Sequence, residues 1–175
     1  MNKRTVALTS EQYKEIISTM KKGFTGCQPN NRAATALMLE ANLGLRISDI
    51  VKLRLADVVR DGERYRLSIT EQKTGKARTF TVPLALYQFI RCYCLDNGIA
   101  TDELMFPITT RAIQKQLKLV CDYLDIKGIG LTVFVSSMLQ RFTGTATTIS
   151  LLSNSSYSIA AQQLPSDILA SRLRK

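Results

Sequence analysis

Four basic residues are candidates for binding an anion. Arg46 follows Gly44 and Leu45 at the end of one apolar segment and directly precedes the next apolar segment. Lys73, Lys76 and Arg78 lie in and beside a polar stretch that separates two alternating segments. A guanidinium offers two parallel N–H donors to an oxyanion, whereas an ammonium is a mobile point charge. These residue types therefore suit the binding of an anionic group.

Each of these features also has a simpler interpretation. An arginine after the end of a helix can bind the terminal carbonyls of that helix. Lysines at the tip of a hairpin are commonly solvated, and a positive net charge can serve solubility alone. Their order along one chain favours a shared function over three unrelated explanations.

The composition indicates one soluble domain with a polyanionic partner. Among 175 residues, 24 Lys and Arg stand against 14 Asp and Glu, a net charge of +10. A bias of that size in one domain predicts binding to nucleic acid. No apolar run approaches the ~20 residues of a membrane-spanning helix, and the N-terminus lacks the apolar stretch of a signal peptide. We expect a cytoplasmic protein without membrane contacts.

The sequence contains no Cys or His motif for a metal site. Histidine is absent, which removes the commonest general base and the commonest zinc ligand. The four cysteines form no CxxC pair and have no metal-binding spacing: Cys27, Cys92, Cys94 and Cys121. We expect free thiols that serve mostly in packing, and neither a metal nor a cofactor.

Helices are predicted on the N-terminal side of Arg46 and directly after it. The stretch 9–12, TSEQ, has the form of a capping box and begins a helix that ends before Gly23. A second, strongly apolar helix runs from Arg32 to Asn42 and is closed by Gly44. Ser48 is expected to cap a third helix, which would contain the apolar residues Ile50, Val51, Leu53 and Leu55.

The lysines are predicted to lie at the tip of a β-hairpin. Residues 64–70 and 78–82 alternate polar with apolar side chains, and the stretch EQKTGKA between them is basic and contains glycine. Pro83 can open a helix that Gly98 ends. The fold class is therefore α+β, with a mainly helical core and a small antiparallel hairpin or sheet.

A last helix and a tail of different character follow. The helix is predicted to start at Thr109 or Thr110 and to end near Lys127 and Gly128. Residues 131–175 are rich in Ser, Thr, Ala and Leu, and show no sustained period of either kind. We divide the chain into a domain over residues 1–130 and a divergent tail over 131–175, so the fold is incomplete at its C-terminus.

The order of these motifs resembles the catalytic domain of tyrosine recombinases, the phage integrase family. The resemblance covers residues 5–130 in order. Its matching residues are Gly44-Leu45-Arg46-Ile47-Ser48-Asp49, Leu53-x-Leu55-x-Asp57-Val58, Lys73-Thr74-Gly75-Lys76-x-Arg78 with Val82-Pro83-Leu84, and Leu104-Met105-Phe106-Pro107. It implies DNA integration and recombination through a phosphotyrosine link, with double-stranded DNA and other recombinase protomers as partners, in a protein encoded on a mobile element.

The resemblance also implies roles for individual residues. Arg46 would clamp the non-bridging oxygens of the phosphorane, and Asp49, one helical turn on, would hold its guanidinium. Lys73 would protonate the departing 5'-oxygen, with Lys76 as the competing candidate. Arg46, Lys73, Lys76 and Arg78 together would form the DNA-binding surface.

Two parts of the family pattern are missing from this sequence. No N-terminal helical domain precedes the matching residues, so we expect that the chain does not encircle DNA. The His-x-x-Arg box and the tyrosine nucleophile are absent from the tail. Asp167 and Ile168 stand near the position of the nucleophile, Tyr157 lacks the family context, and Arg141 is expected to be solvent-exposed. We therefore assign no nucleophile.

A neighbouring reading frame accounts for the missing boxes. When the last base of each codon is joined to the first two of the next, residues 130–136 permit Thr, His, Ser, Phe, Arg and Lys in the family order. Residues 158–161 permit His, Ser, Ser, and residues 165–171 permit Gln, Arg, Tyr, Leu and Gly. Our hypothesis is a single-base frameshift near Gly128 to Leu131, which leaves an out-of-frame tail and a catalytically dead chain.

Two further functions are compatible with these features. A non-catalytic DNA-binding remnant could occupy recombination sites or regulate an intact recombinase. An unrelated helical DNA-binding protein is a third reading, which the order of Arg46 and Lys73 disfavours.

Overall fold

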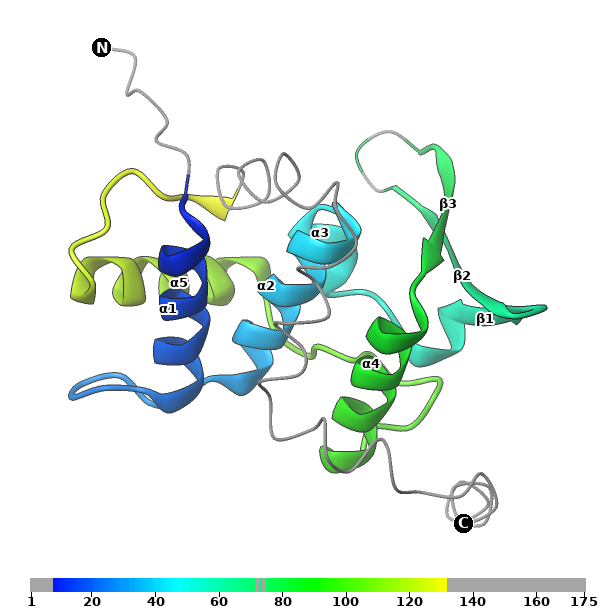
Figure 1. The fold of residues 1–175 in the computed structure, drawn as a ribbon, viewed down its shortest axis with the longest axis horizontal. Coiled ribbons are helices and arrows are strands. Elements are labelled where there is room, and N and C mark those ends of the chain that lie inside the picture. Colours follow the sequence, from blue (N-terminus) through cyan, green and yellow to red (C-terminus); the bar gives the residue numbers. More distant parts are fainter. Residues whose placement is uncertain (1–7, 72, 74, 132–175) are drawn as a thin grey trace.

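The computed structural model describes residues 8–71, 73 and 75–131. Helices α1, α2 and α5 lie on one side of this part of the molecule and the strands lie on the other, with α4 beside the strands (Figure 1). The described elements, in order, are α1 (Ser10–Lys22), α2 (Asn31–Leu43), α3 (Ile47–Ile50), the 3-10 turn η1 (Leu55–Asp57), β1 (Val58–Asp61), β2 (Arg64–Thr70), β3 (Ala77–Val82), α4 (Leu84–Asp96) and α5 (Thr110–Tyr123). The predicted α+β class is confirmed.

Helix α1 begins at the predicted capping box. The hydroxyl of Thr9 accepts the N–H of Gln12 at 3.1 Å, and the side chain of Gln12 accepts the N–H of Thr9 at 2.9 Å. The buried face of the helix has helical spacing and consists of Tyr13, Ile16, Ile17 and Met20. The local pattern was therefore sufficient to place this helix.

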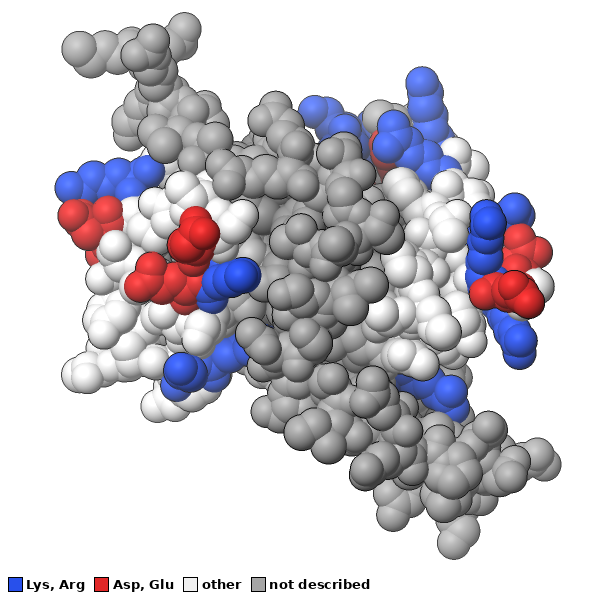
Figure 2. All heavy atoms as spheres, viewed as in Figure 1, with Lys and Arg blue, Asp and Glu red and all other residues white. Residues whose placement is uncertain are grey.

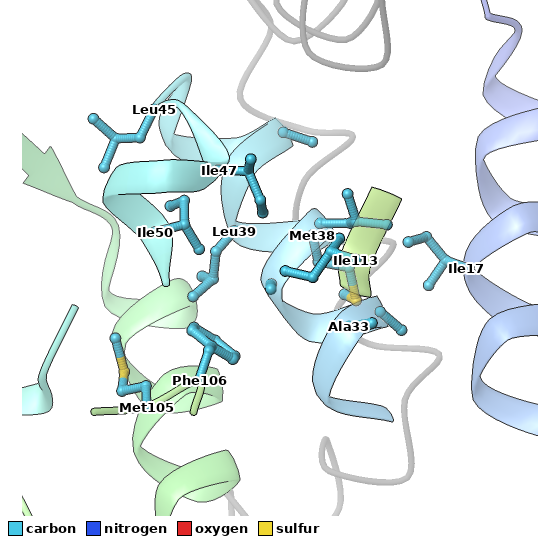
Figure 3. Close-up of a cluster of buried hydrophobic side chains, with 14 of the residues drawn as sticks. Ile17, Ala33, Met38, Leu39, Leu45, Ile47, Ile50, Met105, Phe106 and Ile113 are labelled. Carbon is cyan, nitrogen blue, oxygen red and sulfur yellow. The ribbon is translucent and has the colours of Figure 1, made fainter. Parts of the chain in front are cut away.

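Helix α2 is the centre of the core. Every residue from 33 to 41 is buried, and the helix contacts both α1 and α3. Figure 3 shows Leu39 near Ile50 and Phe106, with Met38 nearer to Ile113. A helix that is buried all round needs small side chains where neighbours approach, and Ala33, Ala34 and Ala36 supply them.

The three strands form an antiparallel sheet in the order β1-β2-β3. The predicted hairpin is present, with Leu67 of β2 opposite Phe80 of β3. Strand β1 was not predicted; it pairs with β2 so that Asp61 lies opposite Arg64. Gly62, at φ 62°, makes the two-residue turn between them, where a left-handed conformation favours glycine.

The predicted third helix is wrong in its start and its length. Arg46, and not Ser48, is the N-cap residue, and α3 ends at Ile50. The chain then leaves the helical path because Leu53 accepts the backbone N–H of Met105 at 2.9 Å. Leu55 belongs to η1 instead, where the carboxylate of Asp57 accepts the N–H of Arg54 at 2.8 Å.

The last two helices start where the sequence predicted. Helix α4 follows Pro83, and the hydroxyl of Thr109 caps α5 by accepting the N–H of Ala112. Helix α5 ends at Tyr123, earlier than predicted, and Asp125 then has a left-handed φ of 52°. This conformation is incompatible with a continuing helix.

The cysteines behave as packing residues. Cys94 and Cys121 are buried, Cys27 and Cys92 are half-buried, and all four are free thiols. Burial raises the pKa of Cys94 and of Cys121 to about 11, so both thiols stay protonated at neutral pH.

Candidate functional site

Arg46 lies on a short connection that its neighbours hold in place. Gly44 closes α2 in the left-handed conformation, at φ 65°, and its N–H donates to the carbonyl of Glu40. Leu45 and Ile47, on either side of Arg46, are both buried. Arg46 itself has an extended backbone and an exposed side chain. Two buried neighbours thus fix the backbone, and the guanidinium points outward.

The carboxyl of Glu40 joins α2 to the start of α3. It accepts a hydrogen bond from the backbone N–H of Ile47, the residue after Arg46. Glu40 is 2% exposed, and burial raises the pKa of its carboxyl to about 8. This buried contact adds a second constraint on the backbone at Arg46.

The guanidinium of Arg46 pairs with a carboxylate from the sheet. Arg46 Nη1 lies 3.3 Å from Glu71 Oε2, and the side chain of Arg46 is 50% exposed. The simpler interpretation, in which Arg46 only binds the last carbonyls of α2, does not account for this ion pair. Half of the side chain faces solvent and is accessible to a ligand.

Asp49, the residue predicted to hold the Arg46 guanidinium, lies in α3. It is buried, and its backbone N–H donates to the carbonyl of Arg46 at 2.9 Å. The carboxylate of Glu71 also pairs with the Arg46 guanidinium. A role for Asp49 in holding the guanidinium remains a prediction.

Glu71 also pairs with a second arginine, Arg78 of β3. Arg78 Nε lies 3.0 Å from Glu71 Oε1, so the two carboxylate oxygens engage two different guanidinium groups. The structure thus brings Arg46 and Arg78, two of the predicted DNA-binding residues, onto one carboxylate. Sequence reasoning missed this residue.

The signal that could have identified Glu71 is the period of the strand before it. In β2, Leu67 is buried and Tyr65 and Ile69 are half-buried, while the residues between them are more exposed. Glu71 continues the inward-facing series by two residues and is 7% exposed. A buried acidic residue is commonly paired with a cationic one. The alternation of β2 could therefore have indicated that Glu71 is buried and pairs with a basic residue.

The lysines lie at the β2–β3 end of the sheet, as predicted. Lys73 and Lys76 are exposed, and Gly75 between them has a left-handed φ of 65°. Lys and Arg side chains gather at the upper right of Figure 2, over this end of the sheet in Figure 1. Exposure alone fits solvated lysines as well as DNA-binding lysines, so their roles stay predictions.

Several predicted features fall outside the described residues. These are the tail from 132 onward and, within it, Arg141, Tyr157, Asp167 and Ile168. In the described part of the chain, no group of His, Cys, Asp and Glu side chains could hold a metal ion. None of the helices described there is long and apolar enough to cross a bilayer.

Solved structures of a site-specific recombinase share this fold. The first is XerH site-specific recombinase bound to a palindromic difH substrate in a post-cleavage complex, with a TM-score of 0.59 and 12% sequence identity. The second is XerH bound to a difH substrate in a pre-cleavage complex, with a TM-score of 0.57 and 14% identity. The matches cover 98% and 94% of this chain but 53% and 52% of those chains, so this chain spans about half their length.

The comparison with family models identifies the family. No curated protein sequence matches this chain. The model of the phage integrase family matches residues 7–139, which include Arg46, the hairpin and the last described helix. The match extends past residue 130 into the predicted tail and ends at residue 139. The chain therefore belongs to the phage integrase family of tyrosine recombinases.

Proposed function

We propose that this chain binds the phosphate backbone of double-stranded DNA and derives from a site-specific recombinase. The observation that carries the proposal is the convergence of Arg46 and Arg78 on Glu71, beside the hairpin tip with Lys73 and Lys76. Arg46 and Arg78 keep 50% and 55% of their side chains exposed. Guanidinium and ammonium groups arranged in this way suit phosphate contacts, which carry affinity but no base sequence.

The proposed site has part of the family's catalytic set, Arg46 and a lysine proton donor, without the His-x-x-Arg box or the tyrosine nucleophile. Arg46 would contact the non-bridging oxygens, and Lys73, or in second place Lys76, would supply a proton to the departing 5'-oxygen. Asp49 would support Arg46 from the buried side. Without a tyrosine in the family context, no phosphotyrosyl bond forms, and we expect a catalytically dead chain.

One experiment separates DNA binding from strand cleavage. The full chain is mixed with a fluorescent duplex, and affinity is measured between about 50 and 200 mM NaCl, because phosphate contacts make binding strongly salt-dependent. A nicked suicide duplex then tests for a covalent adduct on a denaturing gel. We expect salt-sensitive binding and no adduct. A trapped adduct refutes the loss of catalysis, and an absence of salt-sensitive binding refutes the DNA-binding function.

We further propose that residues 131–175 are an out-of-frame translation of a recombinase C-terminus. The support is the order in which the missing boxes reappear in the neighbouring frame. Sequencing the coding DNA through codons 125 to 135, and translating all frames onward, tests this directly. An open frame with a Thr-His-x-x-Arg box and a later Gln-Arg-Tyr is expected. If neither neighbouring frame is open, the tail is this protein's own sequence.

A second candidate function is regulation of an intact recombinase. The retention of Arg46 and Lys73 in a chain without a nucleophile favours it, since such a chain would occupy a site without cutting it. It predicts that adding this chain lowers cleavage by an active recombinase on their shared site.

The DNA partner also leads us to propose a cytoplasmic location and an origin on a mobile element.

A further inference from the structure

Glu71 lies where two separate parts of the proposed site meet. Its carboxylate binds Arg46, on the connection between α2 and α3, and Arg78, on β3. The two arginine side chains are half-exposed, whereas the side chain of Glu71 is 9% exposed. A nearly buried carboxylate thus holds two solvent-facing guanidinium groups from beneath.

The backbone of Glu71 closes the hairpin tip. Its N–H donates to the carbonyl of Lys76 at 3.0 Å, and its carbonyl accepts the N–H of Gly75 at 2.8 Å. Lys73 lies inside the loop that these two hydrogen bonds define. The same residue therefore anchors the loop of Lys73 through its backbone and holds Arg46 through its side chain.

The ion-pair geometry leaves both arginines able to bind a further anion. The carboxylate meets Nη1 of Arg46 and Nε of Arg78. A guanidinium has five N–H donors in a rigid plane, so fixing one nitrogen orients the remaining donors. An arginine held in this way loses less side-chain freedom when it meets a phosphate.

We infer that Glu71 is a positioning residue, which sets the Arg46 guanidinium and the Lys73 loop in a fixed relation so that both meet the same stretch of DNA backbone. The inference rests on the proposed function and deepens it. Arg46 and Glu71 are 25 residues apart in sequence, and their contact is the ion pair that joins the helical part of the site to the hairpin.

The direction in which one substitution changes DNA affinity distinguishes a positioning role from simple electrostatics. Glu71→Gln removes a negative charge beside a basic surface, so electrostatics alone predicts tighter DNA binding. The positioning role predicts the opposite, because the guanidinium of Arg46 loses its anchor. Glu63→Gln is the matched control, since Glu63 is exposed in the β1–β2 turn of the same sheet and the charge change is identical.

The experiment measures duplex affinity and its salt dependence for the full chain and these variants. For Glu71→Gln we expect weaker binding and a salt slope lower by about 0.9, the loss of one phosphate contact. Glu63→Gln is expected to bind as tightly as the parent chain or more tightly. Because both act on one contact, Arg46→Ala should add little to Glu71→Gln in the double variant.

Three results overturn the inference or separate it from the proposed function. If Glu71→Gln binds like Glu63→Gln, the positioning role fails while DNA binding stands. If the parent chain shows no salt-dependent binding, both fail. If circular dichroism shows that Glu71→Gln does not fold, Glu71→Asp takes its place: its charge is unchanged but its side chain is shorter, and unaltered affinity then overturns the inference.

Discussion

The buried carboxyl of Glu40 accepts a hydrogen bond from the backbone N–H of Ile47 and so ties α2 to the first residue of α3. Its Oε2 atom is buried and has no hydrogen-bond partner in the described part of the chain. A carboxyl with one hydrogen bond and little solvent is more stable protonated than ionised. The carboxyl of Glu40 therefore loses its proton at a higher pH than an exposed glutamate does.

Folding stability is expected to fall as the pH rises from about 4.5 to about 8. Over this range the unfolded chain releases the Glu40 proton, while the folded chain keeps it because the folded pKa is about 8. The folded state binds more protons, so the free energy of unfolding decreases with pH, by about 1.4 kcal/mol for each unit of pKa difference. Glu40→Gln cannot titrate and should lack this component.

Urea unfolding of both proteins at a series of pH values from about 5 to 9 tests the assignment. The difference between the two stability curves isolates Glu40 from every other titrating group. We expect Glu40→Gln to gain stability relative to the parent as the pH rises. Curves that stay parallel would show that Glu40 ionises normally.

Gly44→Ala is expected to destabilise the fold by roughly 1–2 kcal/mol. Gly44 has φ 65°, where a Cβ atom crowds the following carbonyl oxygen. Gly44→Asn should cost less, since asparagine tolerates this conformation. Chemical denaturation of the two variants gives the comparison, and equal costs would argue against backbone strain as the cause.

Substitution of Arg46 should affect phosphate contact more than overall charge. Arg46→Ala is expected to lower the slope of log affinity against log salt by about 0.9, whereas Arg46→Lys should keep most of it. Lys14→Ala, at an exposed position on α1, is the control and should leave the slope unchanged. Similar losses for Arg46→Ala and Lys14→Ala in a salt titration would reduce Arg46 to a generic surface charge.

Lys73 and Lys76 are expected to contribute equally to DNA binding, but only Lys73 is expected to be needed for cleavage. Lys73→Ala and Lys76→Ala are each expected to weaken duplex binding by a similar factor, since both side chains are exposed. In a version with the reading frame restored, only Lys73→Ala should abolish cleavage of a suicide duplex. Loss of cleavage in Lys76→Ala alone would move the proton donor to Lys76.

The features that the sequence determined by itself are those encoded within a few residues. The capping box of α1 joins Thr9 to Gln12, and the left-handed Gly44 ends α2 next to its own last turn. The alternating strands β2 and β3 were equally readable, because one buried face imposes a period of two. The order of Arg46 and the hairpin lysines was sufficient to indicate the family, which the match over residues 7–139 confirms.

The tertiary structure decided the features that depend on distant partners. Helix α3 ends at Ile50 because Leu53 pairs with Met105, a residue that no local pattern around Ser48 could reveal. The ion pair of Arg46 with Glu71 joins residues 25 positions apart, and only the packing of the sheet against the helices brings them within 3.3 Å. Hydrogen bonds between close neighbours in sequence follow from residue type, whereas the distance across a long-range ion pair depends on how the whole core places its elements.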